Sequence, residues 1–171
     1  MKSRKQPKTL KDLKKSGYVT VSIRDEMRNN LIRKMKNQEE LFPGIIGYEN
    51  TVTPQIENAI LSGQDIIFLG ERGQGKSRLI RCMVNLLDEQ VPYIEGCEIN
   101  DDPFKPICSS CKEKIADSGD SLPISWLSRD DRYSEKLATP DISVADLIGE
   151  IDPIKVAEGR YLSDELTIHY G

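Results

Sequence analysis

The chain has 171 residues, of which 37% are hydrophobic, 6% aromatic and 30% charged, and its formal net charge is −4. A chain of this length can bury a core without disulfide cross-links. It has no run approaching the ~20 consecutive apolar residues of a transmembrane helix, and its basic start has no apolar segment behind it. We therefore expect neither a membrane nor a secreted protein, but a cytoplasmic one.

The charge is unevenly distributed along the chain. Residues 1–36 hold 12 Lys and Arg against 3 Asp and Glu, whereas the remainder holds 12 against 25. We interpret residues 1–15 as a basic, flexible arm. The alternative is a patch for nucleic acid or an acidic protein. Because no aromatic residues interleave with the basic ones, we do not expect a nucleic-acid partner.

An N-terminal strand and helix are expected over residues 16–44. Alternation over 18–23 predicts a short strand, and apolar spacing over 24–40 predicts a helix that Pro43-Gly44 ends. A second helix is expected over 53–62, since Thr53 can cap it and Gly63 suits its end.

A buried strand and a further helix are expected next. The compact apolar run 65–69, between Gly63 and Gly70, is typical of a buried parallel strand. Apolar spacing predicts a helix over 75–88. Residues 95–135 have the composition of an inserted segment, and short helices are expected over 145–148 and 153–158.

The strongest motif is G-E-R-G-Q-G-K-S, which runs from Gly70 to Ser77 and matches the phosphate-binding pattern G-x-x-x-x-G-K-[ST]. Its glycines let successive backbone N–H groups face one anion, and the following helix adds its positive N-terminal end. Lys76 should reach the β- and γ-phosphates, and Ser77 should ligate Mg²⁺. The motif predicts binding of ATP or ADP with Mg²⁺.

Two further stretches resemble a known family. Residues 45–49, I-I-G-Y-E, are similar to the adenine-contacting stretch at the start of AAA+ ATPase modules. Residues 138–160 resemble the magnesium chelatase ATPase-subunit group within AAA+, including an L-x-G-x-x-D element at 147–152. The run T-I-H-Y-G at 167–171 is similar to the segment before that group's acidic magnesium-binding strand.

The resemblance implies a fold and an activity for residues 45–171. The implied fold is an α/β, three-layer P-loop sandwich around a parallel sheet, incomplete at its C-terminal side. The implied activity is ATP hydrolysis in a ring of identical subunits that remodels a client protein complex. The nucleotide-binding residues expected from the motif and the resemblance are Ile46, Gly47, Gly70, Glu71, Arg72, Gly73, Gln74, Gly75, Lys76, Ser77 and Arg78.

Two departures from the family's pattern affect these expectations. Gln74 stands where many relatives have Thr, at a loop position expected to tolerate the change. The sequence ends at Gly171, before the acidic Walker B strand, the sensor residue and the arginine finger that hydrolysis requires. We therefore interpret the chain as an N-terminal fragment that contains no catalytic residue, and expect nucleotide binding without efficient turnover.

Two other functions stay open at this point. A non-hydrolysing, nucleotide-sensing module could contact a protein or nucleic acid through its basic start or its cysteine-containing insertion. A small-molecule kinase could use the same loop, but it would not carry the chelatase-like stretch.

Three of the four cysteines, Cys97, Cys108 and Cys111, lie in the insertion with the spacing C-x10-C-x2-C. Two thiolates separated by two residues can bind one tetrahedral zinc ion. The missing fourth ligand could be His169, Asp101 or Asp102, although the spacing requires none of them. An iron–sulfur site, free thiols and a redox disulfide are the alternatives, and Cys82 is expected to pack as a small apolar residue.

Overall fold

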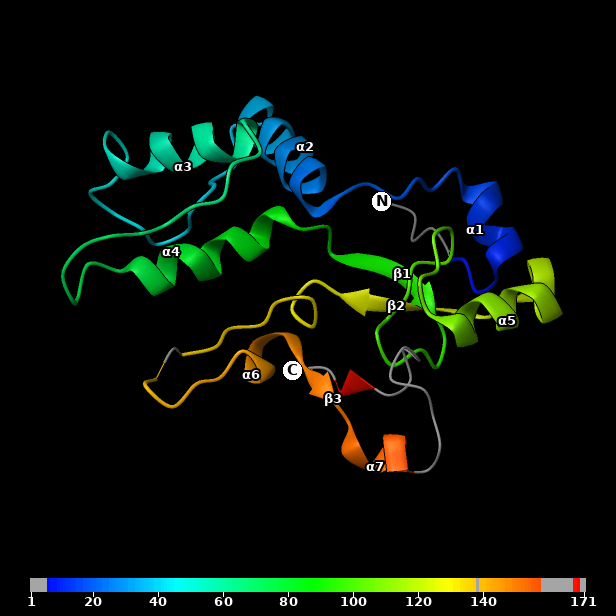
Figure 1. Cartoon of the computed structure of the whole chain (residues 1–171). Helices are drawn as coiled ribbons and strands as arrows, with labels where there is room; N and C mark the ends of the chain where they lie inside the picture. Colours follow the sequence, from blue (N-terminus) through cyan, green and yellow to red (C-terminus); the bar gives the residue numbers. More distant parts are fainter. Residues whose placement is uncertain (1–5, 138, 158–167, 170–171) are drawn as a thin grey trace.

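Figure 1 shows the computed structural model of the chain, which describes residues 6–137, 139–157 and 168–169. Within these residues the chain forms short helices and small antiparallel sheets. The helices are α1 (Leu10–Ser16), α2 (Ile23–Lys36), α3 (Val52–Leu61), α4 (Lys76–Met83), η1 (Val84–Leu86), α5 (Ser109–Ser118), η2 (Gly119–Ser121), α6 (Ala145–Ile148) and α7 (Pro153–Ala157). The strands are β1 (Gln90–Ile94), β2 (Ile124–Ser128), β3 (Glu150–Ile151) and β4 (Ile168–His169).

The expected three-layer sandwich around a parallel sheet is wrong. Strand β1 pairs antiparallel with β2, from Gln90 opposite Ser128 to Ile94 opposite Ile124. Strand β3 pairs antiparallel with β4. Each of these sheets has two strands, so in the described residues there is no parallel sheet for helices to cover on both faces.

The segment 65–69, expected to be a buried parallel strand, is extended but is not a strand of either sheet. Ile66 and Phe68 pack against a core cluster, whereas Ile67 and Leu69 are 83% and 89% exposed. A strand needs a hydrogen-bonded neighbour, and the described residues place none beside this segment. The apolar run therefore buries one face instead of two.

The expected N-terminal elements are partly corrected. Residues 18–22 form no strand, because Ser22 accepts a hydrogen bond from the Asp25 amide (3.1 Å) and starts α2 at Ile23. Helix α2 ends at Lys36, short of the expected Glu40. Part of the basic arm forms α1, where Leu10 and Leu13 are buried.

The later helices agree better with the sequence. Helix α3 confirms the helix expected over 53–62, but it begins at Val52 after Thr51, so Thr53 lies inside the helix and is not its cap. Helices α6 and α7 confirm the short helices, and residue 158 lies outside the described residues. Helix α5, in the segment interpreted as an insertion, was not expected. The helix expected over 75–88 is shorter: α4 passes into the 3₁₀ turn η1. The Leu86 carbonyl accepts a hydrogen bond from the Asn30 side chain (3.0 Å), at the point where the turn ends.

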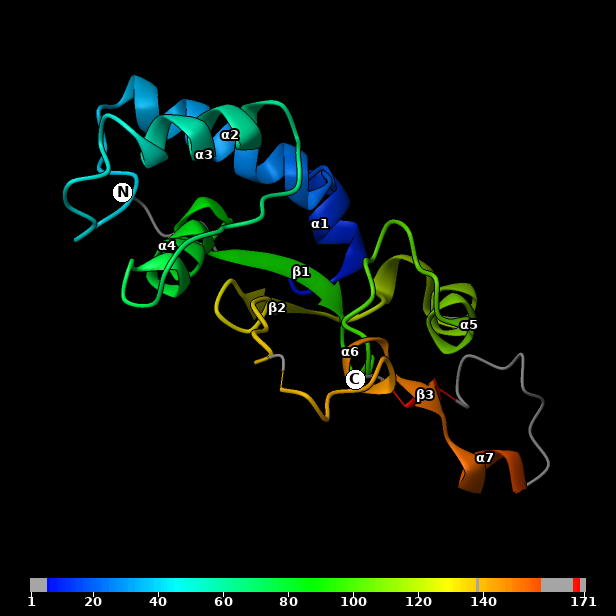
Figure 2. The same cartoon turned by 60° about the vertical axis from the view of Figure 1, so that its left-hand side comes forward.

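Two clusters of buried apolar residues lie within the two groups of helices that Figure 2 shows toward opposite ends of the β1–β2 ribbon. The first cluster joins α2, α3, α4 and η1 and consists of Leu31, Phe42, Ile56, Ile60, Leu79 and Leu86. The second joins α1, β1 and α5 and consists of Leu10, Ile94, Cys97, Cys111 and Leu122. The phosphate-loop motif therefore belongs to the first group of helices, and the cysteines to the second. None of the described helices is long and apolar enough to cross a membrane.

Candidate functional site

The glycine-rich loop leads directly into α4, whose first residue is Lys76. Gly73 and Gly75 have φ angles of 86° and 70°, in the left-handed region that glycine adopts without steric cost. Gly75 immediately precedes the helix, so the unpaired N–H groups of the first turn of α4 lie at the loop. This part of the motif has the local structure that anion binding at a helix start requires.

The Lys76 ammonium folds back across this loop. Its Nζ donates hydrogen bonds to the carbonyl oxygens of Gly70 (2.9 Å) and Glu71 (2.5 Å). Within the described residues, no carboxylate forms an ion pair with Lys76. The loop thus holds a positive charge against backbone carbonyls without neutralising it.

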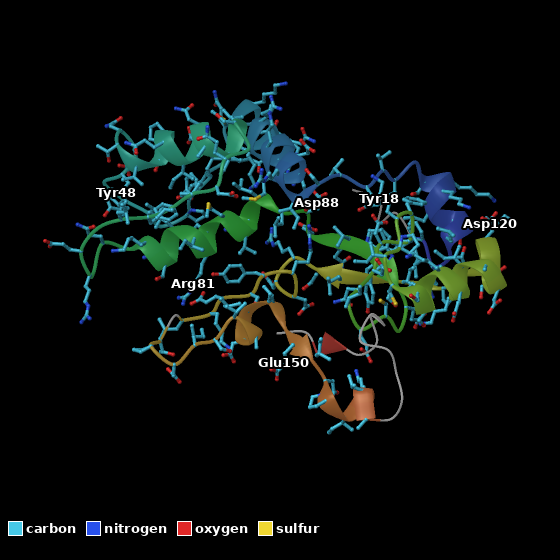
Figure 3. The ribbon with its side chains drawn as sticks, viewed as in Figure 1. Tyr18, Tyr48, Arg81, Asp88, Asp120 and Glu150 are labelled. Carbon is cyan, nitrogen blue, oxygen red and sulfur yellow. The ribbon has the colours of Figure 1, made fainter. Side chains whose placement is uncertain are left out.

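Tyr48 connects the expected adenine-contacting stretch to the loop. Its hydroxyl donates a hydrogen bond to the Gln74 carbonyl (2.9 Å), and Figure 3 labels its position. The amide side chain of Gln74 lies over Gly70, where a β-carbon would collide with it. The sequence alone did not reveal either contact.

The side chains of the remaining predicted nucleotide residues face solvent or other parts of the chain. Ile46 is 87% exposed, and the Gly47 amide donates to the Glu49 carboxylate (3.0 Å). The Arg78 guanidinium turns back toward Gly44, where a β-carbon would collide with it. Glu71 and Arg72 are exposed loop residues. The structure therefore gathers Gly70, Gly73, Gly75 and Lys76 but does not place Ile46 and Arg78 with them.

Ser77 is an exposed residue in the first turn of α4 and lines a cavity of about 310 Å³. The opposite wall of this cavity is residues 133–137. Glu135 accepts two hydrogen bonds from Arg81 (2.8 and 2.5 Å) and one from the Tyr133 hydroxyl (2.8 Å). These hydrogen bonds lower the pKa of Glu135 to about 2, and those from Arg81 contribute most.

The three insertion cysteines come together with Asp101. The Sγ atoms of Cys97, Cys108 and Cys111 and a carboxylate oxygen of Asp101 all lie within 4.8 Å of one another. Cys111 is fully buried, and Cys97 and Asp101 are 9% and 6% exposed. This cluster could hold a metal ion, since thiolate and carboxylate are both metal ligands.

Local structure brings these side chains together from two elements. A tight loop follows β1 and is closed by the hydrogen bond from the Ile94 amide to the Asp101 carbonyl (2.9 Å). Cys108 is the N-cap residue of α5, and Cys111 lies in that helix's first turn. The C-x2-C spacing therefore puts two thiols on the same side of a helix start.

Burial raises the pKa of the Cys111 thiol well above its ordinary value, and hydrogen bonding with Cys97 and Cys108 raises it further. A thiol that does not ionise readily among apolar neighbours becomes a thiolate ligand when a cation replaces its proton. Cys82 lies outside this group, with its Sγ 3.9 Å from the Pro43 carbonyl.

The structure distinguishes the alternatives for a fourth ligand. Asp101 belongs to the cluster. Asp102 instead accepts hydrogen bonds from the Phe104 amide (2.8 Å) and the Thr20 hydroxyl (3.2 Å). The side chain of His169 lies outside the described residues. No sequence pattern marked Asp101 over Asp102; in the structure the amides of Ile107 and Cys108 bind the Asp101 carboxylate and hold it beside the thiols.

Comparisons with known proteins found no matching family model, no matching curated protein and no matching solved structure.

Proposed function

We propose that the loop Gly70–Ser77 binds the phosphates of a nucleoside triphosphate, ATP in the first instance, together with Mg²⁺. The observation that carries this proposal is the placement of Lys76. Its ammonium lies across the loop on the Gly70 and Glu71 carbonyls, at the start of α4. A phosphate bound there would meet the ammonium and the free amides of the helix start together.

The residues fit such a ligand in part. The left-handed Gly73 and Gly75 leave the backbone open to an anion, and exposed Ser77 offers a hydroxyl oxygen for Mg²⁺. When bound, Mg²⁺ would supply charge neutralisation for the phosphates. The exposed side chain of Ile46 offers no pocket for the base. The phosphates, more than the base, are therefore expected to carry the affinity.

Isothermal titration calorimetry with MgATP tests this proposal. We expect the unaltered chain to bind, and Lys76→Ala to weaken binding about 10- to 100-fold, because a charged hydrogen-bonding group is lost. Lys36→Ala is the matched control: it removes an exposed lysine from α2 and should leave the affinity unchanged. Absence of binding by the folded chain, or equal binding by Lys76→Ala, would refute the proposal.

The resemblance to the magnesium chelatase group of AAA+ ATPases extends this proposal. It implies hydrolysis of the bound nucleotide, a ring of identical subunits and a client protein complex. These stay predictions, as do the alternative of a non-hydrolysing binding module and the cytoplasmic location. The parallel-sheet fold that the resemblance implied gives these predictions no support, because the described strands are antiparallel.

A second proposal concerns the cysteine cluster, which we infer to bind Zn²⁺ through Cys97, Cys108 and Cys111. Its support is the convergence of three thiols and a carboxylate within 4.8 Å. Zinc prefers thiolate ligands in tetrahedral structural sites, whereas Mg²⁺ and Ca²⁺ prefer oxygen.

Elemental analysis of the purified chain, with its cysteines kept reduced, tests the zinc proposal. We expect about one zinc ion per chain, and a marked loss in Cys108→Ser. Cys82→Ser, which alters the cysteine outside the cluster, should retain the metal. Less than about 0.1 zinc ion per unaltered chain after incubation with zinc would exclude the site.

A further inference from the structure

We propose that Asp101 is the fourth ligand of this metal ion, which makes the site a closed, four-coordinate Cys3Asp centre. The inference rests on the proposed zinc site and adds the ligand that the cysteine spacing does not supply. A closed structural zinc site takes four protein ligands, whereas a site with three keeps a position open for water or substrate. The identity of the fourth ligand therefore decides whether this centre is structural or chemically open.

The placement of Asp101 is that of a ligand. One of its carboxylate oxygens lies within 4.8 Å of each of the three Sγ atoms, inside the same cluster. The residue is 6% exposed, about as buried as the thiols around it. A metal ion at the centre of these four atoms would have four protein ligands and would need none from solvent.

The hydrogen bonds of Asp101 hold its carboxylate beside the thiols. Its two oxygens accept four hydrogen bonds from three backbone amides, those of Asp102, Ile107 and Cys108, at 2.9–3.1 Å, and the Ile107 amide is shared between both oxygens. A metal ion at one oxygen would replace that oxygen's share of the Ile107 bond, and the carboxylate would keep the other three. The amide bonds also fix the orientation of the carboxylate, as second-shell contacts do for metal ligands.

The charge of Asp101, which four amide hydrogen bonds stabilise in part, also favours a cation beside it. Among the described residues, no lysine or arginine forms an ion pair with it. A buried carboxylate is costly unless it is paired or coordinates a metal. A zinc ion at the cluster carries two positive charges, so it would offset half of the four negative charges of the carboxylate and the three thiolates.

A four-coordinate centre would hold three parts of the chain together: the end of β1, the start of α5 and helix α1. Cys97 follows β1, Cys108 and Cys111 begin α5, and Cys97 and Cys111 share a core cluster with Leu10 of α1. The Leu10 amide donates to the Leu122 carbonyl (2.9 Å), which binds α1 to the same unit. The metal would therefore stabilise the core cluster against which the basic helix α1 packs.

Cobalt substitution distinguishes a ligand from a neighbour. Sulfur-to-cobalt charge-transfer absorption grows with the number of coordinating thiolates. Asp101→Cys should therefore raise this absorption by about a third, from three thiolates to four. Asp101→Asn should keep the three-thiolate intensity but weaken metal binding by about 100-fold or more. Asp117→Asn, which alters an exposed carboxylate on α5, is the control and should change neither.

The outcomes separate this inference from the zinc proposal. If the unaltered chain binds cobalt through three thiolates and Asp101→Cys leaves the absorption unchanged, the zinc site stands and Asp101 is not a ligand. The same conclusion follows if Asp101→Asn binds cobalt as tightly as the unaltered chain. If the unaltered chain binds neither zinc nor cobalt, both proposals fail.

Discussion

The Glu26 carboxylate and the Arg132 guanidinium form a two-pronged ion pair, with N–O distances of 2.7 and 2.6 Å. The two side chains are 4% and 11% exposed. One oxygen of Glu26 also accepts a hydrogen bond from the Asp88 amide (2.6 Å), at a position that Figure 3 labels. The hydrogen bonds between Arg132 and Glu26 raise the pKa of Arg132. Because Glu26 lies on α2 and Arg132 follows β2, the pair joins the phosphate-loop helices to the β1–β2 ribbon.

Removing the charge of Glu26 should destabilise the chain strongly. Glu26→Gln leaves the Arg132 guanidinium buried without a counter-ion, which costs about 3–5 kcal/mol when one partner of a buried pair is lost. Urea unfolding measures the change in the free energy of unfolding. Asp65→Asn breaks the exposed pair with Arg24 and should cost under about 1 kcal/mol. Equal costs for the two variants would show that the buried pair has no special role.

The carboxyl group of Glu135 should titrate near pH 2, and Arg81→Ala should raise its pKa toward the ordinary value of 4.5. Arg81 stabilises the ionised carboxylate, so the stabilisation is present above about pH 4.5 and is lost as the pH falls through about 2. NMR titration of the Glu135 side chain gives both values. If the pKa of Glu135 were the same in Arg81→Ala as in the unaltered chain, Arg81 would not be the cause of the lowered pKa.

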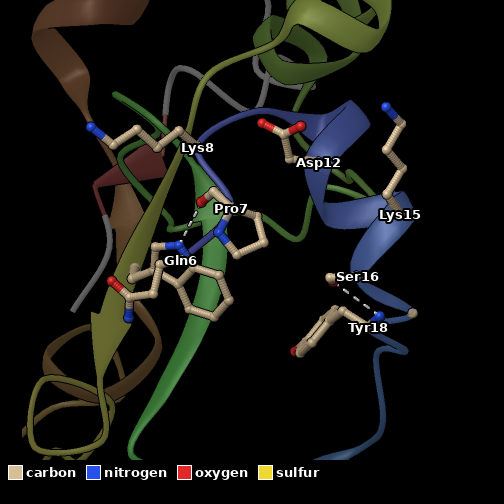
Figure 4. Close-up of a pocket in the computed structure, with 9 residues that line it drawn as sticks. Gln6, Pro7, Lys8, Asp12, Lys15, Ser16 and Tyr18 are labelled. Atoms are coloured by element: carbon tan, nitrogen blue, oxygen red, sulfur yellow. Dashed lines mark hydrogen bonds between the residues drawn. The ribbon is translucent and has the colours of Figure 1, made fainter. Parts of the chain in front are cut away.

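Removal of the proposed zinc ion should loosen the contact between the basic arm and Trp126. The Trp126 indole Nε1 donates to the Pro7 carbonyl (2.9 Å), and its ring lies 6.5 Å from that of Tyr18. Tyr18 in turn stacks on Phe104 (6.2 Å), in the loop between Asp101 and Cys108. Figure 4 shows the cavity of about 860 Å³ that these arm contacts border, with Tyr18 facing Gln6 and Pro7. Aromatic contacts thus connect the cysteine cluster with the arm.

Trp126 is the single tryptophan of the chain, so its fluorescence reports this contact directly. A chelator should shift its emission to longer wavelength as water reaches the indole, and added zinc should reverse the shift. Cys108→Ser serves as the control, because it should already show the shifted emission and respond little to the chelator. Unchanged emission after the unaltered chain has released its metal would contradict this coupling.

The helices were predicted only in part. Helix α3 formed where it was expected, whereas α1 and α5 formed in segments interpreted as a flexible arm and an insertion. The cap at Ser22 explains why α2 begins at Ile23 instead of continuing a strand. The glycine-rich loop expected before α4 has Gly73 and Gly75 in the left-handed region. These features depend on residues close together in the sequence.

The sheets could not be predicted in the same way, because pairing depends on distant residues. Residues 65–69 have the composition of a buried strand, but their structure depends on a neighbour that the described chain does not provide. Strand β1 contains Pro92 and pairs with the segment around Trp126, which the sequence analysis placed only in an inserted segment. Asp101 was one of three possible ligands until the loop after β1 placed it beside the thiols.

Comparison of ATP, ADP and AMP binding tests the central claim, that the phosphates are recognised at Lys76 and the start of α4. Equilibrium competition in the presence of Mg²⁺ gives the three affinities under one set of conditions. We predict that ATP and ADP bind at least about tenfold more tightly than AMP, since only they reach the Lys76 ammonium with a β-phosphate. The difference should disappear in Lys76→Ala. Equal affinities of the unaltered chain for all three nucleotides would contradict the claim.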